Sequence, residues 1–163
     1  MCCNGDCEHT HDKYTYEGIT SCAACAGLYG GRAACAYGCL GCGDCQKACN
    51  FDAIVVEDGL AKVDQAKCTG CGACADACPK NIIWVRPAEE KAVVLCANHD
   101  KGAQTRKVCT AGCIACMKCQ KTCPEDAIHV VDNVARVDYA KCTGCGQCVA
   151  VCPVHVITIP KTV

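Results

Sequence analysis

Apolar residues in this chain occur in short alternating segments, which are separated by turn residues and by closely spaced cysteines. Two pairs of such segments each flank a two-residue turn: residues 53–56 and 60–63 around Asp58-Gly59, and residues 127–131 and 134–137 around Asp132-Asn133. Turns of two residues join antiparallel strands, and Gly and Asn tolerate the positive φ that these turns need. The pattern therefore predicts two β-hairpins.

Short helices and closing strands are predicted around the hairpins. The helical candidates all end at a cysteine and are residues 44–49, 73–78, 118–123 and 147–152. Alternating apolar residues at 82–85 and 156–159 predict one closing strand after each hairpin. We therefore expect an α+β fold of short hairpins and short helices. No segment approaches the roughly 18–20 apolar residues that a membrane-spanning helix needs.

Cysteine dominates the composition, with 24 of 163 residues. Aromatic residues make up only 4% of the chain, so the large side chains that usually fill a core are scarce. Small domains generally need disulfides, metals or partners to remain folded. We therefore expect an inorganic group, held by cysteine, at the centre of the fold.

Ten of the cysteines recur at a constant offset of 74 residues, which indicates an internal duplication. The first copy contains Cys22, Cys35, Cys39, Cys42, Cys45, Cys49, Cys68, Cys71, Cys74 and Cys78, and the second contains Cys96, Cys109, Cys113, Cys116, Cys119, Cys123, Cys142, Cys145, Cys148 and Cys152. The expected organisation is an N-terminal cysteine-rich segment, a first module, a connector and a second module, at residues 1–35, 36–86, 87–109 and 110–163.

Each copy contains the spacing C-x2-C-x2-C-x3-C twice, and three of the four runs are followed by proline, with Asn50 replacing it after Cys49. This spacing is typical of bacterial ferredoxins that hold two [4Fe-4S] clusters, in which three thiolates of a run bind one cluster and the fourth binds the other. The predicted sets, numbered as the first to fourth sites in this order, are Cys39, Cys42, Cys45 and Cys78; Cys49, Cys68, Cys71 and Cys74; Cys113, Cys116, Cys119 and Cys152; and Cys123, Cys142, Cys145 and Cys148. Iron, in four clusters, is the predicted metal.

Disulfides and zinc are the competing explanations for so many cysteines. A disulfide scaffold belongs to an oxidising compartment, but residues 1–30 lack the basic and apolar regions of a secretion signal. Zinc sites built from cysteine usually combine two pairs across a longer loop, whereas this chain repeats triplets with a displaced fourth cysteine. The spacing therefore favours iron–sulfur clusters, with zinc as the minor alternative.

Eight cysteines lie outside the four predicted sites: Cys2, Cys3, Cys7, Cys22, Cys25, Cys35, Cys96 and Cys109. One hypothesis is a fifth cluster bound by Cys3, Cys7, Cys22 and Cys35, with Cys2 or Cys25 as substitutes. Loose surface thiols are the alternative for the N-terminal cysteines. Cys96 and Cys109 are either packed thiols or partners of Cys22 and Cys35 at a site between the modules.

The formal net charge of −1 counts every cysteine as neutral. A [4Fe-4S] cluster with its four thiolates carries about two negative charges, so four clusters bring the protein to about −9. The sequence shows no stripe of Lys and Arg with aromatic residues, so nucleic acid is not an expected partner. It also shows no phosphate-binding loop. We therefore expect electron transfer, with no catalytic residues and no substrate site in the chain itself.

Several segments outside the cysteine runs are distinctive: Tyr16-Glu17-Gly18-Ile19 before Cys22, Tyr37 to Gly43, Asp52-Ala53-Ile54, Asp100-Lys101-Gly102-Ala103, Gly112-Cys113-Ile114, and Asp138 to Cys142. With these segments the chain resembles the B subunit of the Rnf complex, the ion-translocating ferredoxin:NAD oxidoreductase. The resemblance covers nearly the whole chain. It implies that this polyferredoxin region takes electrons from soluble reduced ferredoxin and passes them to other Rnf-type subunits.

The resemblance also implies a cytoplasmic location, at the cytoplasmic face of a membrane and within a complex. The family further implies an N-terminal membrane helix and an additional cysteine-rich segment, which this sequence does not contain. We therefore expect membrane contact only through partners or through a missing anchor. The alternative function is a free-standing soluble polyferredoxin that serves another oxidoreductase.

Overall fold

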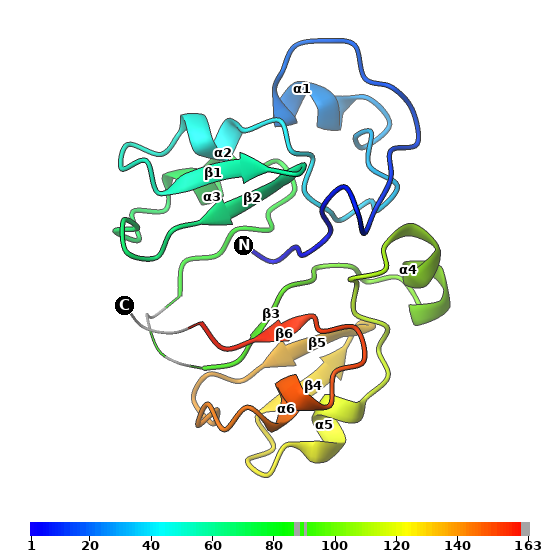
Figure 1. Cartoon of the computed structure of the whole chain (residues 1–163), viewed down its shortest axis with the longest axis vertical. Helices are drawn as coiled ribbons and strands as arrows, with labels where there is room; N and C mark the ends of the chain where they lie inside the picture. Colours follow the sequence, from blue (N-terminus) through cyan, green and yellow to red (C-terminus); the bar gives the residue numbers. More distant parts are fainter. Residues whose placement is uncertain (87–88, 90, 161–163) are drawn as a thin grey trace.

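The computed structural model describes residues 1–86, 89 and 91–160, and these residues form two lobes (Figure 1). Each lobe contains one β-hairpin with a short helix before it and another after it. In the first lobe these elements are α2 (Asp44–Lys47), β1 (Ile54–Glu57), β2 (Leu60–Val63) and α3 (Ala73–Asp76). In the second lobe they are α5 (Lys118–Thr122), β4 (Ile128–Val131), β5 (Val134–Val137) and α6 (Gln147–Ala150). The predicted α+β fold is confirmed.

Both predicted hairpins are confirmed, each as an antiparallel pair in a two-stranded sheet. The first hairpin pairs Ile54 with Val63, and the second pairs the residues that lie 74 positions later. The second turn residue has a positive φ in both hairpins, 74° at Gly59 and 62° at Asn133. The two copies therefore fold alike because each supplies a residue that accepts this backbone conformation.

The four predicted helices are also confirmed, although each ends before the cysteine that closes its predicted range. Two further helices, α1 (Cys22–Gly27) and α4 (Gly102–Val108), were not predicted. At the start of α1, Ser21 Oγ accepts a hydrogen bond from Ala24 N and donates one to Asp44 Oδ2 at 2.8 Å. This cap joins α1 to the first residue of α2.

Only one of the two predicted closing strands forms in the described part of the chain. β6 (Ile157–Thr158) pairs antiparallel with β3 (Val93–Val94), whereas residues 82–85, all of them described, form no strand. In the second lobe Leu95 N donates to Val156 O at 2.7 Å, and in the first lobe Cys2 N donates to Ile82 O at the same distance. The N-terminal residues therefore take the place of β3 in the first lobe. They lack the consecutive ladder bonds that define a strand, so the prediction for 82–85 is wrong.

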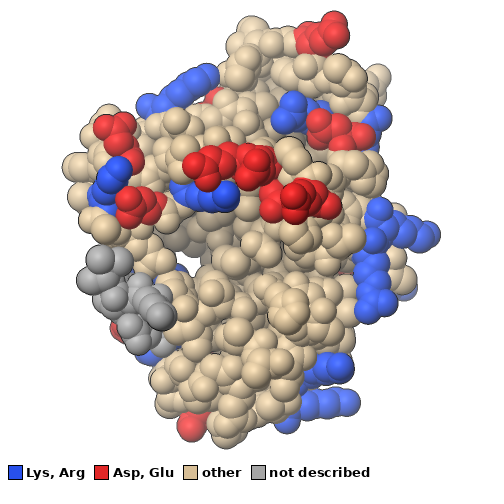
Figure 2. Space-filling model, viewed as in Figure 1, with Lys and Arg blue, Asp and Glu red and all other residues tan. Residues whose placement is uncertain are grey.

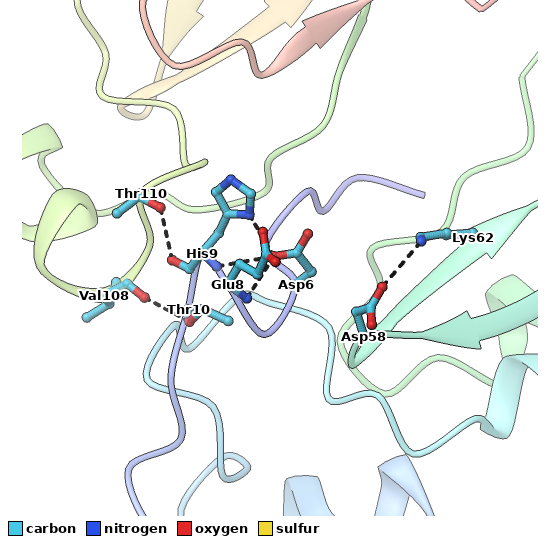
Figure 3. A network of polar contacts seen from close by, with 8 residues as sticks. All are labelled: Asp6, Glu8, His9, Thr10, Asp58, Lys62, Val108 and Thr110. Atoms are coloured by element: carbon cyan, nitrogen blue, oxygen red, sulfur yellow. Dashed lines mark hydrogen bonds and ion pairs between the residues drawn. The ribbon is translucent and has the colours of Figure 1, made fainter.

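The N-terminal segment runs between the lobes and is bonded to both (Figure 1). Cys7 N donates to Asp58 O, in the turn of the first hairpin, at 2.9 Å. On the other side, Thr10 Oγ1 donates to Val108 O at 2.8 Å, and Thr110 Oγ1 donates to His9 O at 3.4 Å (Figure 3). Thr110 N also donates to His9 O, at 2.9 Å. The segment is therefore part of the contact between the lobes.

The apolar core is thin in both lobes and includes cysteine side chains. In the first lobe, Ile54, Ala61 and Ile83 pack with Cys45. In the second lobe the fully buried apolar side chains include Ile128, Val134 and Val156, which pack among cysteines of the third and fourth sites. The space that a larger apolar core would fill is therefore lined by thiols.

Parts of two predicted segments lie outside the described residues, namely 87, 88 and 90 in the connector and 161–163 at the end of the second module. The described part of the connector range contains β3 and α4. Among the described residues, no helix combines the length and apolar character that crossing a membrane requires.

We expect Ile82→Ala to destabilise the first lobe, because this side chain is only 2% exposed and its loss leaves a cavity. Replacements of this kind cost about 2–5 kcal/mol. The measurement is the guanidinium midpoint followed by circular dichroism on protein carrying its metal. Val85→Ala is the matched control, since Val85 is 59% exposed and its loss is expected to cost no more than about 0.5 kcal/mol. Equal midpoints for the two variants would contradict the burial argument.

Candidate metal centres

Cysteine thiols line five cavities in the part of the chain that the structure describes, and no cysteine is paired in a disulfide. Two of these cavities lie in the first lobe and two in the second. The fifth is lined by residues of both lobes and of the N-terminal segment.

The second site brings its four predicted cysteines together in the first lobe. Cys68 and Cys71 precede α3, Cys74 lies within it, and Cys49 reaches the same cavity from the run that contains α2. The cavity has a volume of about 420 Å³. Burial raises the pKa of the Cys74 thiol, and the charges of the other three cysteines raise it further. The four sulfurs are therefore close enough to share one charged group.

The third site brings together its predicted cysteines in the second lobe. Cys113 and Cys116 precede α5, Cys119 lies within it, and Cys152 follows α6. Burial, followed by the charges of Cys113, Cys116 and Cys152, raises the pKa of Cys119 to about 11. In the absence of a metal this thiol would therefore remain protonated at neutral pH.

The fourth site likewise contains its four predicted cysteines. Cys142, Cys145, Cys148 and Cys123 line a cavity of about 20 Å³. Burial raises the pKa of Cys148, and the charges of the other three act in the same direction. Ala127 N donates a hydrogen bond to Cys123 Sγ at 3.3 Å. Backbone donors of this kind tune the reduction potential of a cluster bound to the sulfur.

The first site brings together three of its four predicted cysteines. Cys39, Cys45 and Cys78 line one cavity, but the fourth cysteine that lines it is Cys22 and not Cys42. Burial raises the pKa of Cys45 to about 11, and the charges of Cys39, Cys22 and Cys78 contribute. The Cys42 thiol instead donates to Leu40 O at 3.5 Å.

Cys42 lies in a second thiol group with Cys22 and Cys25. Burial and the charges of these two cysteines raise the pKa of Cys42 to about 12. Cys25 is fully buried and packs with Cys22 and Leu40. Cys22 therefore lies between the two groups, within reach of either.

The four cysteines predicted for a fifth cluster are not brought together. Cys3 and Cys35 line the cavity between the lobes, whereas Cys22 belongs to the first site. Cys7 is exposed and lies beside Gly59 in the turn of the first hairpin. The cavity between the lobes is completed by Cys96 and Cys109 from the second lobe.

Single metal ions require a tighter group of side chains than a cluster does. Among the described residues, no three His, Cys, Asp or Glu side chains are placed to hold one ion. His9 Nδ1 is instead 2.6 Å from Asp6 Oδ1 (Figure 3). A [4Fe-4S] cluster lies between its four thiolates, so its ligands need not meet at one point.

The cysteines differ in how far they are shielded from water. Cys68 and Cys71 of the second site are exposed, as are Cys116 and Cys145 of the third and fourth sites. Beside the second site, Trp84 is 51% exposed and its ring lies 5.1 Å from the guanidinium of Arg136 in the other lobe. This cation–π contact joins the two lobes at the rim of the second cavity.

The protein surface carries charges of both signs, with acidic side chains gathered over the first lobe in the view of Figure 2. Lys62 Nζ lies 3.1 Å from Glu57 Oε2 and 3.7 Å from Asp58 Oδ2. Its hydrogen bond to Glu57, together with the charges of Glu57, Asp58 and Asp6, raises the pKa of this exposed lysine. The single positive charge of Lys62 therefore offsets only part of the negative charge of these three carboxylates, and this part of the surface remains acidic.

Known protein families match the cysteine-dense regions. Three families, each described as a 4Fe-4S dicluster domain, match residues 38–83, 67–127 and 106–159. The first and third of these ranges contain the hairpins of the two lobes. The sequence is therefore similar to [4Fe-4S]-binding domains in both copies of the duplication.

Curated relatives cover most of the chain. It is 47% identical over 140 residues to the B subunit of the Na(+)-translocating ferredoxin:NAD(+) oxidoreductase complex of Acetobacterium woodii, covering 85% of this chain and 42% of the relative. It is 50% identical over 137 residues to the B subunit of the proton-translocating ferredoxin:NAD(+) oxidoreductase complex of Clostridium ljungdahlii, covering 83% and 48%. It is 44% identical over 140 residues to the B subunit of the ion-translocating oxidoreductase complex of Methanosarcina acetivorans, covering 85% and 53%. The chain thus spans about half the length of these relatives.

We expect Cys22→Ala to remove the cluster of the first site, because the Cys22 thiol lines the cavity with Cys39, Cys45 and Cys78. Iron should fall by about four per chain, as one [4Fe-4S] cluster is lost. Cys42→Ala is the matched variant and should keep its iron, since Cys42 lies outside that cavity. Iron loss in Cys42→Ala alone would instead support the ligand set predicted from the motif. The measurement is iron and acid-labile sulfide per chain under anaerobic conditions.

Proposed function

Because families described as 4Fe-4S dicluster domains match this chain, and its relatives are B subunits of ion-translocating ferredoxin:NAD(+) oxidoreductase complexes, we propose that it relays single electrons within such a complex. The observation that carries this proposal is the grouping of thiols. Four cavities are each lined by four cysteines, with at least one cysteine of each set contributed by a distant part of the chain. The repeated grouping of thiols supports a chain of one-electron sites.

The proposed ligands of the four sites are thiolates that the fold holds in fixed positions. When bound, a [4Fe-4S] cluster accepts and releases one electron at a potential set by cluster charge, hydrogen bonds and exposure. The protein chain controls the hydrogen bonds to the cluster and the exposure of the cluster to water. Buried thiols such as Cys119 and Cys148 keep water from the interior, while backbone N–H groups such as that of Ala127 donate to sulfur. Each thiol must lose its proton before it can ligate a cluster.

We place the arrival of electrons at the second site. Cys68 and Cys71 are exposed there, and the cavity has the largest volume of the four. Apolar side chains that are themselves partly exposed, Phe51 and Trp84, lie at its rim. A separate protein that carries one electron, reduced ferredoxin in this proposal, could approach this site without any movement of the lobes. Other components of the complex, at the cytoplasmic face of the membrane, would receive the electrons.

The test is anaerobic reconstitution of the whole chain with iron and sulfide, followed by mixing with reduced ferredoxin. We expect at least about sixteen irons per chain and rapid bleaching of the visible cluster absorbance. Cys74→Ala should lose about four irons, because Cys74 lines the cavity of the second site, and should slow the reduction by ferredoxin. Cys7→Ala is the matched control, since Cys7 lies outside all four sites.

Two results would overturn the proposal. One is zinc in place of iron in protein prepared anaerobically. The other is iron-loaded protein that strong chemical reductants bleach but reduced ferredoxin does not, because the sites would then serve another electron carrier.

A further inference from the structure

Four cysteines that the four sites do not use meet between the lobes. Cys35, Cys96 and Cys109 are each 7–8% exposed, and Cys3 lies with them at the same cavity. The charges of Cys35 and Cys3 act on Cys109, and that of Cys35 acts on Cys96, so the four sulfurs lie near one another. The cavity volume is about 20 Å³, the same as at the first and fourth sites.

The four cysteines form two equivalent pairs. Cys35 and Cys109 are equivalent by the 74-residue offset of the duplication. Cys3 and Cys96 are equivalent by position in the fold, because each follows a residue whose N–H donates to the repeat-equivalent carbonyls of Ile82 and Val156. Each lobe therefore presents the same two thiols to the other lobe, with the N-terminal segment counted as part of the first.

Backbone donors point at these sulfurs in the same way in both lobes. Cys3 Sγ accepts from the N–H groups of Cys39, at 3.5 Å, and Gly5. Cys96 Sγ accepts from the N–H groups of Cys113, at 3.3 Å, and Asn98, at 3.4 Å. Cys39 and Cys113 are themselves repeat-equivalent. Two donors on each sulfur suit a negatively charged, metal-bound thiolate better than a neutral thiol, which is a weak acceptor.

A buried side chain also donates into this cavity. Asn98 is 1% exposed, and its Nδ2 donates to Cys35 Sγ at 3.4 Å. The orientation of the amide is fixed because Asn98 Oδ1 accepts from Asp100 N at 2.7 Å. Cys109 Sγ accepts from the N–H groups of Ala111 and Gly112. All four sulfurs thus receive hydrogen bonds from N–H donors.

We propose that Cys3, Cys35, Cys96 and Cys109 hold one further [4Fe-4S] cluster, bound across the contact between the lobes. The inference rests on the proposed function, because it extends the same one-electron chemistry to a fifth site. It differs from the set predicted from the sequence in replacing Cys7 and Cys22 by the two second-lobe cysteines. A site that draws two ligands from each lobe also joins the lobes covalently through the metal.

The position of this site defines its role in the relay. One N–H donor to Cys3 belongs to Cys39 of the first site, and one N–H donor to Cys96 belongs to Cys113 of the third site. The cluster between the lobes therefore neighbours one site of each lobe. With clusters bound, a single electron would pass from the first site to it and then to the third site. At each transfer the donor is oxidised by one electron, the acceptor is reduced by one, and no bond forms or breaks.

The experiment is native mass spectrometry, with iron and sulfide analysis, of the whole chain loaded anaerobically. We expect about twenty irons in the unaltered protein and about sixteen in Cys35→Ala and in Cys109→Ala, which test the two lobes separately. Cys7→Ala and Cys2→Ala are the controls and should retain about twenty. Cys7 belongs to the set predicted from the sequence, and Cys2 lines the same cavity without belonging to the proposed set.

The outcomes separate this inference from the proposed function. About sixteen irons in the unaltered protein would overturn the fifth site while leaving the relay through four sites intact. Iron loss in Cys7→Ala, with retention in Cys109→Ala, would overturn the proposed ligand set. If an alanine variant fails to fold, the iron count of the unaltered protein still decides between four clusters and five.

Discussion

Sulfur ligation by cysteine is the interaction on which both lobes depend. Few apolar side chains are large and fully buried, and those of the second lobe pack directly among thiols. Each hairpin of four-residue strands is too small to be stable in isolation. Bound metal would join segments far apart in the chain, such as Cys49 and the start of α3, at one point. The short helices lie within the cysteine runs, and each of the four helices in the hairpin lobes ends before the last cysteine of its run.

Duplication explains most of the architecture, and the departures from it are informative. Equivalent residues form both hairpins, and Cys39 and Cys113 make equivalent bonds to sulfur. The copies differ where the first lobe meets the N-terminal segment. There Cys3 occupies the position that Cys96 has in the second lobe, and Cys22, the sequence equivalent of Cys96, lies instead beside the first site. Because Cys3 takes the position equivalent to that of Cys96, Cys22 can lie at the first site instead.

Local patterns in the sequence predicted the elements that local physics determines. The two-residue turns, the hairpins and the four short helices follow from residue types within a few positions of one another. The closing strand at 82–85 failed because its partner is the N-terminal segment, which the repeat does not reveal. The grouping of Cys3 with Cys109 was missed for the same reason, since the offset links Cys22 with Cys96. The sequence does show more cysteines than four sites need, and it shows that Cys35 and Cys109 are repeat-equivalent. That Cys3 and Cys96 join them is visible only in the fold.

The N-terminal segment has a consequence for how the protein is made. Thr10 and Val108 are bonded although 98 residues separate them, and His9 and Thr110 are 101 residues apart. The N-terminal segment can therefore make these contacts only after most of the second lobe has been synthesised. Each lobe has its own hairpin and thiol groups within one continuous stretch, so metal insertion there does not require the other lobe. The contact between the lobes would therefore form last, after each lobe has folded and bound its own metal.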